Sequence, residues 1–255
     1  MNQMTLYVEK ESFIHRIDPL TKLLFAFISI LITYLTADRL FVFCILLFTV
    51  ALLLAGKVFK YILPVIGVSF LLILSIILVQ GFFHPDRATI LFSIGPLTIY
   101  KEGFSIALLI TLRVVNMISA FGVVILTTKP DDLVESLVQK GLSHRFGYVL
   151  LSVLQIIPQM IALTGKITDA QRARGLETEG SLWIRFKSFI PLIGPVVLNS
   201  LNETRERSIA LEIRRFNSKG QRTSLYEREP YKYRWIIRAG LLSALFAVIV
   251  WRVGS

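Results

Sequence analysis

Residues 19–56 read "PLTKLLFAFISILITYLTADRLFVFCILLFTVALLLAG", and this stretch decides the class of fold. Its two apolar runs, 19–37 and 40–56, are separated only by Asp38 and Arg39. One helix through both runs would extend over roughly 50 Å, well beyond a bilayer core of about 30 Å. We therefore predict a tight helical hairpin that crosses a membrane twice. Asp18 is expected to be the N-cap of its first helix, with Pro19 in the first turn.

Three further apolar stretches, 61–80, 104–128 and 235–251, have about the length of a membrane helix. Tryptophans at both ends of the last stretch match an interfacial aromatic belt. The chain of 255 residues is 54% hydrophobic, with 18 phenylalanines and a mean hydropathy of +0.66, which excludes a soluble domain of ordinary composition. The sequence predicts an all-α multipass integral membrane protein with about five transmembrane helices.

Basic residues cluster on one side of these spans, and the net charge is +11. Before or at the start of the first span lie Lys10, Arg16 and Lys22, and between the second and third spans lie Lys57 and Lys60. The positive-inside rule then places the N-terminus in the cytoplasm. We expect a four-span membrane domain over 1–128, a cytoplasmic region over 129–234 and a C-terminal transmembrane helix over 235–255. In a chain this apolar, cytoplasmic loops account for the basic excess, so no nucleic-acid partner is expected.

The region 129–234 contains two apolar segments, 148–163 and 189–198. Ser152, Gln155 and Gln159 form a polar stripe on the first, which favours an amphipathic or packed helix over a lipid-facing span. The second is short and contains two prolines. We therefore expect long, partly membrane-apposed coupling helices in the cytoplasm.

Two arginine motifs lie in this region, "DAQRARGLE" at 169–177 and "IALEIRRF" at 209–216. Each has an alanine four residues before an arginine, so the small residue lies one helical turn below the guanidinium. This pattern predicts a pair of helix-in-groove docking elements. The alternative for each motif alone is a basic helix face on solvent or on anionic headgroups. The candidate docking residues are Ala170, Gln171, Ala173, Arg174, Gly175, Ala210, Glu212, Arg214 and Arg215.

Gly175 is expected to end its helix in the left-handed conformation, which leaves Arg174 at the helix C-terminus, where a cation is favoured. The second motif has Arg215 at the equivalent position.

Other motifs do not indicate catalysis, a metal or a cofactor. The string "TGKIT" at 164–168 lacks the hydroxyl residue and the earlier glycine of a phosphate loop. His15, His84 and His144 have no second ligand at metal-binding spacing. Arg113 lies inside an apolar run, where we favour structural pairing, with Asn116 or another helix, over an ion path. An integral-membrane enzyme or a passive scaffold remains the alternative class.

The motif "AQRARG", together with "HRIDPLTKLL" at 15–24, "TTKPDDLVESL" at 127–137 and the second arginine site near "FNSKG", resembles the T component of energy-coupling factor transporters. This cobalt and vitamin permease family imports vitamins and metal ions through the bacterial cell membrane. The resemblance implies a non-catalytic subunit with two ATP-binding cassette ATPase partners and a small substrate-binding membrane protein.

The family's arginines insert into grooves on the two ATPases. Ala173, Arg174 and Gly175 match the first family motif fully, whereas in the second only Arg214 matches. The substrate is chosen by another chain in this family, so thiamine-related precursors, biotin, cobalt and nickel all stay open.

Overall fold

A computed structural model describes residues 6–10, 12–83, 90–94, 97–177, 181–216, 231 and 233–254. His84 and the "NSKG" part of the second arginine site lie outside these residues. The chain divides into two compact units. We call Thr5–Leu142 with Glu229–Ser255 the bundle unit, and Met1–Met4 with Ser143–Arg228 the helix-pair unit.

The bundle unit contains the short helix α1 (Phe13–Arg16) and the helices α2 (Pro19–Leu35), α3 (Arg39–Ala55), α4 (Phe59–Phe83), α5 (Lys101–Thr127), α6 (Pro130–Gln139) and α9 (Arg234–Gly254). The all-α multipass prediction is confirmed, and the structure adds an antiparallel hairpin between α4 and α5. Its strands are β1 (Ile90–Ile94) and β2 (Leu97–Tyr100), with Ile94 opposite Leu97.

The predicted break between the first two spans is confirmed, because α2 ends at Leu35 and α3 begins at Arg39. The Asp38 carboxylate caps α3 by accepting a hydrogen bond from the Leu40 amide. Within the described residues, four helical segments are long and apolar enough to cross a membrane: Phe59–Gln80, Glu102–Thr127, His144–Ala173 and Arg234–Gly254. Helices α2 and α3 are apolar but shorter, with 17 residues each.

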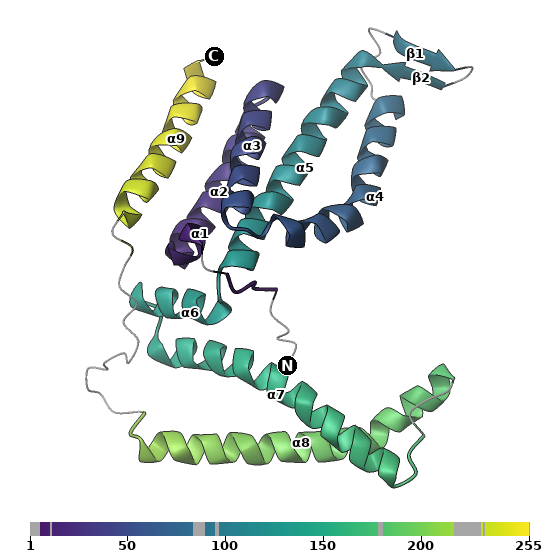
Figure 1. The fold of residues 1–255 in the computed structure, drawn as a ribbon, viewed down its shortest axis with the longest axis vertical. Helices are drawn as coiled ribbons and strands as arrows, with labels where there is room; N and C mark the ends of the chain where they lie inside the picture. The colour runs from purple at the N-terminus through teal and green to yellow at the C-terminus, as the bar shows by residue number, and fades with distance from the viewer. Residues whose placement is uncertain are drawn as a thin grey trace. The chain divides into compact units, whose positions relative to one another are not determined.

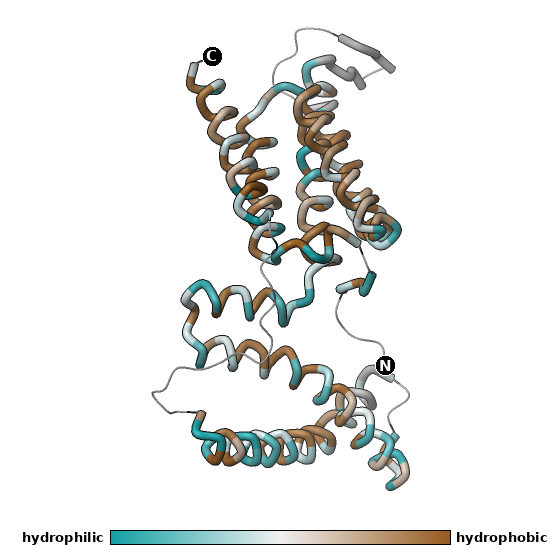
Figure 2. The backbone as a smooth tube through the Cα atoms, turned by 60° about the vertical axis from the view of Figure 1, so that its left-hand side comes forward, coloured by the Kyte–Doolittle hydropathy of each residue, from teal (hydrophilic) through white to brown (hydrophobic). Residues whose placement is uncertain are grey.

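Helix α5 is the centre of the bundle, where it packs against α2, α3 and α4, while α9 packs against α2 (Figure 1). Leu53, Ile62 and Val123 join α3, α4 and α5 in one buried apolar cluster. Gly122 lets α4 approach closely, since a Cβ there would collide with Ile62. Helices α2, α3, α4 and α5 are hydrophobic over most of their length (Figure 2).

Polar side chains also connect the bundle helices. Buried Asn116 on α5 accepts a hydrogen bond from the Thr49 hydroxyl of α3 (2.9 Å) and donates one to the Ser29 hydroxyl of α2 (3.0 Å). These polar side chains are buried and hydrogen-bond with one another instead of with water. The bonds therefore hold the three helices in fixed positions relative to one another.

The N-terminal segment is attached to one end of the bundle. The Val8 amide donates to the Leu126 carbonyl (3.1 Å), and Lys129 forms an ion pair with Glu9 (2.8 Å). This pair lowers the pKa of the Glu9 carboxyl and raises that of Lys129. Lys22, buried at the start of α2, donates to the Thr127 carbonyl at the end of α5 (2.8 Å).

The helix-pair unit consists of α7 (His144–Ala173) and α8 (Leu182–Ile213), which cross each other (Figure 1). Helix α8 is bent, and Pro191 and Pro195 lie inside it, where each removes a backbone donor. The half of α8 toward Ile213 is the more hydrophilic one (Figure 2).

Candidate docking site

Helix α7 ends in a Schellman motif at the first arginine motif. Arg174 is the C-cap, and Gly175 follows with a φ of +89°. The Gly175 amide donates to the Arg172 carbonyl (2.9 Å), and the Leu176 amide donates to the Gln171 carbonyl (3.0 Å). These bonds satisfy carbonyls that a helix end otherwise leaves unpaired, so they fix the backbone at Arg174.

Helix α8 ends in the same way at the second motif. Arg214 is the C-cap, and Arg215 takes the left-handed position with a φ of +55°. The Arg215 amide donates to the Glu212 carbonyl and the Phe216 amide to the Leu211 carbonyl, both at 2.9 Å. The two motifs are therefore equivalent in backbone geometry, although the second has no glycine.

Most of the candidate docking residues are exposed. Gln171 alone is partly buried; Ala170, Ala173, Arg174, Gly175, Ala210, Glu212, Arg214 and Arg215 are exposed. In the described part of the chain, the guanidinium groups of Arg174 and Arg214 have no hydrogen-bond or ion-pair partner, and Ile213 beside Arg214 is 78% exposed. Two unpaired guanidinium groups at fixed helix ends can each receive a carboxylate or a backbone carbonyl from another molecule.

The C-terminal ends of α7 and α8, which Arg174 and Arg214 cap, lie at opposite ends of the crossed pair (Figure 1). At the end near Arg214, the Phe216 ring contacts the Tyr148 ring with centroids 4.9 Å apart. Arg174 lies about 26 residues beyond Tyr148 along α7, so at about 1.5 Å per residue the two arginine ends are roughly 40 Å apart. Between them, Arg207 of α8 donates a hydrogen bond to the Gln159 side chain of α7.

Sequence reasoning missed a groove beside the first arginine. It lies between the end of α7 and the beginning of α8, and in its lining the Ser188 hydroxyl donates a hydrogen bond to the Glu177 carbonyl. Its lining includes Gly175, Leu176, Glu177, Trp183, Lys187 and Pro191. The first motif ends at Glu177 and does not extend to the α8 side of the groove, where the apolar and basic pair Trp183 and Lys187, one turn apart, was the available signal.

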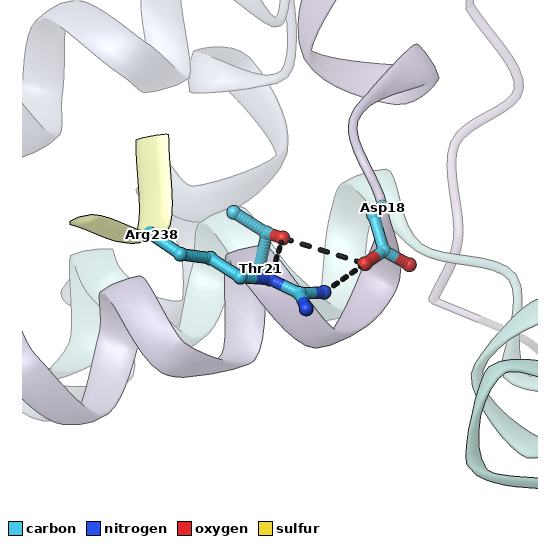
Figure 3. A network of polar contacts seen from close by, with 3 residues as sticks. All are labelled: Asp18, Thr21 and Arg238. Atoms are coloured by element: carbon cyan, nitrogen blue, oxygen red, sulfur yellow. Dashed lines mark hydrogen bonds and ion pairs between the residues drawn. The ribbon is translucent and has the colours of Figure 1, made fainter. Parts of the chain in front are cut away.

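In the bundle unit, the prediction for Asp18 is half right. Asp18 is the N-cap residue of α2 and Pro19 is in the first turn, but the Asp18 carboxylate caps no backbone amide. It instead pairs with Arg238 of α9, which also donates to the Thr21 hydroxyl (2.8 Å), as Figure 3 shows. The cation of α9 draws the carboxylate away from the helix end, and this network fastens α9 to α2.

The prediction that Arg113 pairs structurally is confirmed, but its partner is not Asn116. The Arg113 guanidinium donates to the backbone carbonyls of Thr33 (3.0 Å), Tyr34 (3.3 Å) and Thr36 (3.0 Å). These carbonyls are at the C-terminal end of α2, where a helix has unpaired acceptors and a negative dipole end.

These features define a multipass helical membrane protein with a separate pair of long helices, each of which ends at an exposed, unpaired arginine. A family model described as "Cobalt transport protein" matches residues 10–225. The chain is 33% identical over 227 residues to the energy-coupling factor transporter transmembrane protein of Streptococcus thermophilus, which covers 85% of this chain and 86% of the relative. The corresponding protein of Brevibacillus brevis is 30% identical over 258 residues, covering 97% of this chain and 95% of the relative.

The chain therefore belongs to the family of transmembrane proteins, or T components, of energy-coupling factor transporters. It is the transmembrane component of a transporter and a multipass protein of the cell membrane.

Proposed function

We propose that this chain transmits the motion of two ATP-binding cassette ATPase subunits to a small substrate-binding membrane protein during the import of a vitamin or metal ion. The observation that carries the proposal is the equivalent geometry of the two helix ends, each with an exposed arginine as C-cap. Arg174 docks on one ATPase and Arg214 on the other. ATP hydrolysis belongs to these partners and substrate choice to the small membrane protein.

A separation of roughly 40 Å between the arginines suits two binding sites on two subunits better than one site on a single subunit. When the ATPases approach each other, the two docking points move, and α7 and α8 change their crossing geometry. The ATPases thus bias a two-state element, as a ligand does. The exposed apolar side chains in the first half of α8, among them Phe186, Phe189 and Ile193, are available to the substrate-binding protein.

The proposal also requires the arginine motifs to face the cytoplasm. The bundle end that contains Lys10, Lys22, Lys57 and Lys129 is the more basic one, which supports a cytoplasmic N-terminus. Cysteine accessibility in intact cells tests this orientation, with Cys44 first replaced by serine. A cysteine at Lys60 is expected to be protected from a membrane-impermeant reagent, and one at Arg252 to be labelled.

Docking is tested by affinity purification of the full chain from its native membrane, followed by mass spectrometry. Arg174→Ala and Arg214→Ala are each expected to reduce the yield of ATPase subunits, and the double variant to abolish it. Truncating one partner of a buried, charge-assisted contact costs about 2–5 kcal/mol, or roughly 30-fold or more in affinity.

Arg205→Ala and Lys166→Ala are matched controls, because both residues are exposed cations on the same two helices. These variants are expected to retain the ATPases. Equal loss in the controls would indicate nonspecific charge attraction, and full retention in the double arginine variant would refute docking. If Arg214→Ala alone has no effect, the assignment of the second motif is wrong.

A further inference from the structure

A cluster of three cations surrounds one exposed indole at the beginning of α9. The distances to the Trp235 ring centroid are 5.8 Å from Lys140 Nζ, 5.6 Å from Arg234 Cζ and 5.8 Å from Arg238 Cζ. Lys140 is the C-cap of α6, whereas Arg234 and Arg238 belong to α9, so the fold brings these charges together from two elements. The Trp235 side chain is 64% exposed.

The charges of this cluster are only partly balanced. Arg238 is paired with Asp18. Lys140 and Arg234 have no carboxylate partner among the residues that the structure describes. Each gains a cation–π contact with the indole, but this contact does not remove the repulsion between two like charges gathered around one ring. An anion bound between them would.

The surroundings of the cluster select the kind of anion. Trp235 is in the first turn of α9, an apolar helix long enough to cross a membrane, and this is the position of an interfacial tryptophan. Ile236 beside it is exposed and apolar. A ligand with a phosphodiester and attached acyl chains satisfies both the cations and this apolar surface, whereas free phosphate satisfies only the cations.

We propose that Lys140, Arg234 and Trp235 form a binding site for the headgroup of an anionic phospholipid, at the membrane surface where α6 meets α9. The lipid phosphodiester lies between the two unpaired cations, and its acyl chains follow α9. The site lies in the bundle unit and is independent of the arginine docking proposed above, so either proposal can fail alone.

Quenching of tryptophan fluorescence by brominated lipids tests this site. The full chain contains three tryptophans, so Trp183→Phe with Trp251→Phe leaves Trp235 as the only reporter. This protein is placed in vesicles of phosphatidylcholine with increasing phosphatidylglycerol, and either lipid is brominated near the headgroup end of its chains. Each cation near an anionic surface contributes about fivefold in affinity, so we expect a preference for phosphatidylglycerol of roughly 20-fold at Trp235.

Lys140→Gln with Arg234→Gln is expected to remove this preference, and the charge-conserving pair Lys140→Arg with Arg234→Lys to retain it. Lys57→Gln with Lys60→Gln is the matched control, because it removes two exposed charges at the connection between α3 and α4. A second reporter protein that retains only Trp251 is expected to show no change in any variant.

Three results would overturn the proposal. One is no preference for phosphatidylglycerol at Trp235 in the protein with all its cations. Another is an equal loss of this preference in Lys140→Gln with Arg234→Gln and in the control pair, which would assign the preference to the overall surface charge. The third is removal of the preference by millimolar inorganic phosphate at constant ionic strength, which would assign the cluster to a free anion.

Discussion

Replacing Gly175 by alanine is expected to loosen the end of α7 without introducing a steric clash. Gly175 has a φ of +89°, and a Cβ built there meets no atom within 4 Å. The cost is therefore conformational. It is about 1–2 kcal/mol for an L-residue in the left-handed region, and the upper part of that range applies because +89° lies beyond the usual minimum near +57°.

Amide hydrogen exchange measures this cost directly, because the amides of residues 175 and 176 donate the two bonds of the Schellman motif. A loss of about 2 kcal/mol predicts exchange up to roughly 30-fold faster at these amides. Gly175→Asn is expected to give an intermediate rate, since asparagine tolerates the left-handed conformation. If the proposed docking holds, the affinity for the ATPase subunits falls in the same order, because the backbone at Arg174 is less well fixed.

Two other positions provide controls for this reasoning. Gly141, at the end of α6, has a φ of +113° and equally open surroundings, so Gly141→Ala should accelerate exchange there and leave ATPase binding unchanged. Arg215→Gly should change the exchange rate in the opposite direction. It is expected to slow exchange at the Phe216 amide about fivefold, because glycine removes about 1 kcal/mol of strain in the left-handed conformation. Unchanged exchange in Gly175→Ala, with folding intact, would refute the idea that the left-handed residue holds the helix end.

Three further predictions concern the bundle unit. Asn116→Ala removes hydrogen bonds between three helices and should lower the free energy of unfolding by about 1–2 kcal/mol, measured in bicelles with a denaturing detergent. A double-mutant cycle of Asp18→Asn and Arg238→Gln should give a coupling of about 1–3 kcal/mol, because both side chains are mostly buried, and additivity would show that the pair contributes nothing. Burial lowers the pKa of His15 below 6.5, aided by the charges of Lys22 and Lys10. Neutral His15 therefore stabilises the attached N-terminal segment above pH 6.5, and this stability is lost as the pH falls through the lowered pKa. Hydrogen exchange of residues 6–17 should accelerate on acidification, and less so in His15→Gln.

The helices of the bundle could be predicted because local signals set their ends. The charged pair Asp38 and Arg39 interrupts an apolar run that is too long for a bilayer, and the Asp38 side chain caps the second helix. Pro19 in the first turn of α2 is likewise a local signal, because proline fits the first turn of a helix. The hairpin of β1 and β2 was missed because its nine strand residues are short apolar runs between two long helices, where helical periodicity dominates.

The contacts between helices could not be predicted. Arg113 was correctly expected to pair with Asn116 or with another helix, but the sequence could not say which, and its partners are carbonyls at the end of α2 about 80 residues away. The same reason hid the partner of Asp18, which is Arg238 at the other end of the chain. Such pairs depend on which helices become neighbours, and hydrophobic pattern alone does not specify this.

In the candidate docking site, the equivalence of the two arginine motifs could be predicted from the sequence, whereas the conformation of Arg215 could not. The alanine four residues before the arginine in each motif made Arg174 and Arg214 equivalent, and the structure gives both residues the same C-cap position. In the second motif only Arg214 matches the family pattern and Arg215 replaces the glycine, yet Arg215 adopts the left-handed conformation that glycine has in the first. The ring of the next residue, Phe216, contacts the Tyr148 ring of α7.

The two helix ends differ in the residue that takes the left-handed position, which is Gly175 in the first and Arg215 in the second. The first end is held by the intrinsic freedom of glycine, so its conformation depends little on packing elsewhere. At the second end a residue other than glycine takes the left-handed conformation, and the next residue, Phe216, contacts Tyr148 of α7. A change in the crossing that moves Tyr148 away from Phe216 is therefore expected to act on the backbone next to Arg214. If the proposed docking holds, the second motif is thus expected to respond more strongly to the crossing of the helices than the first.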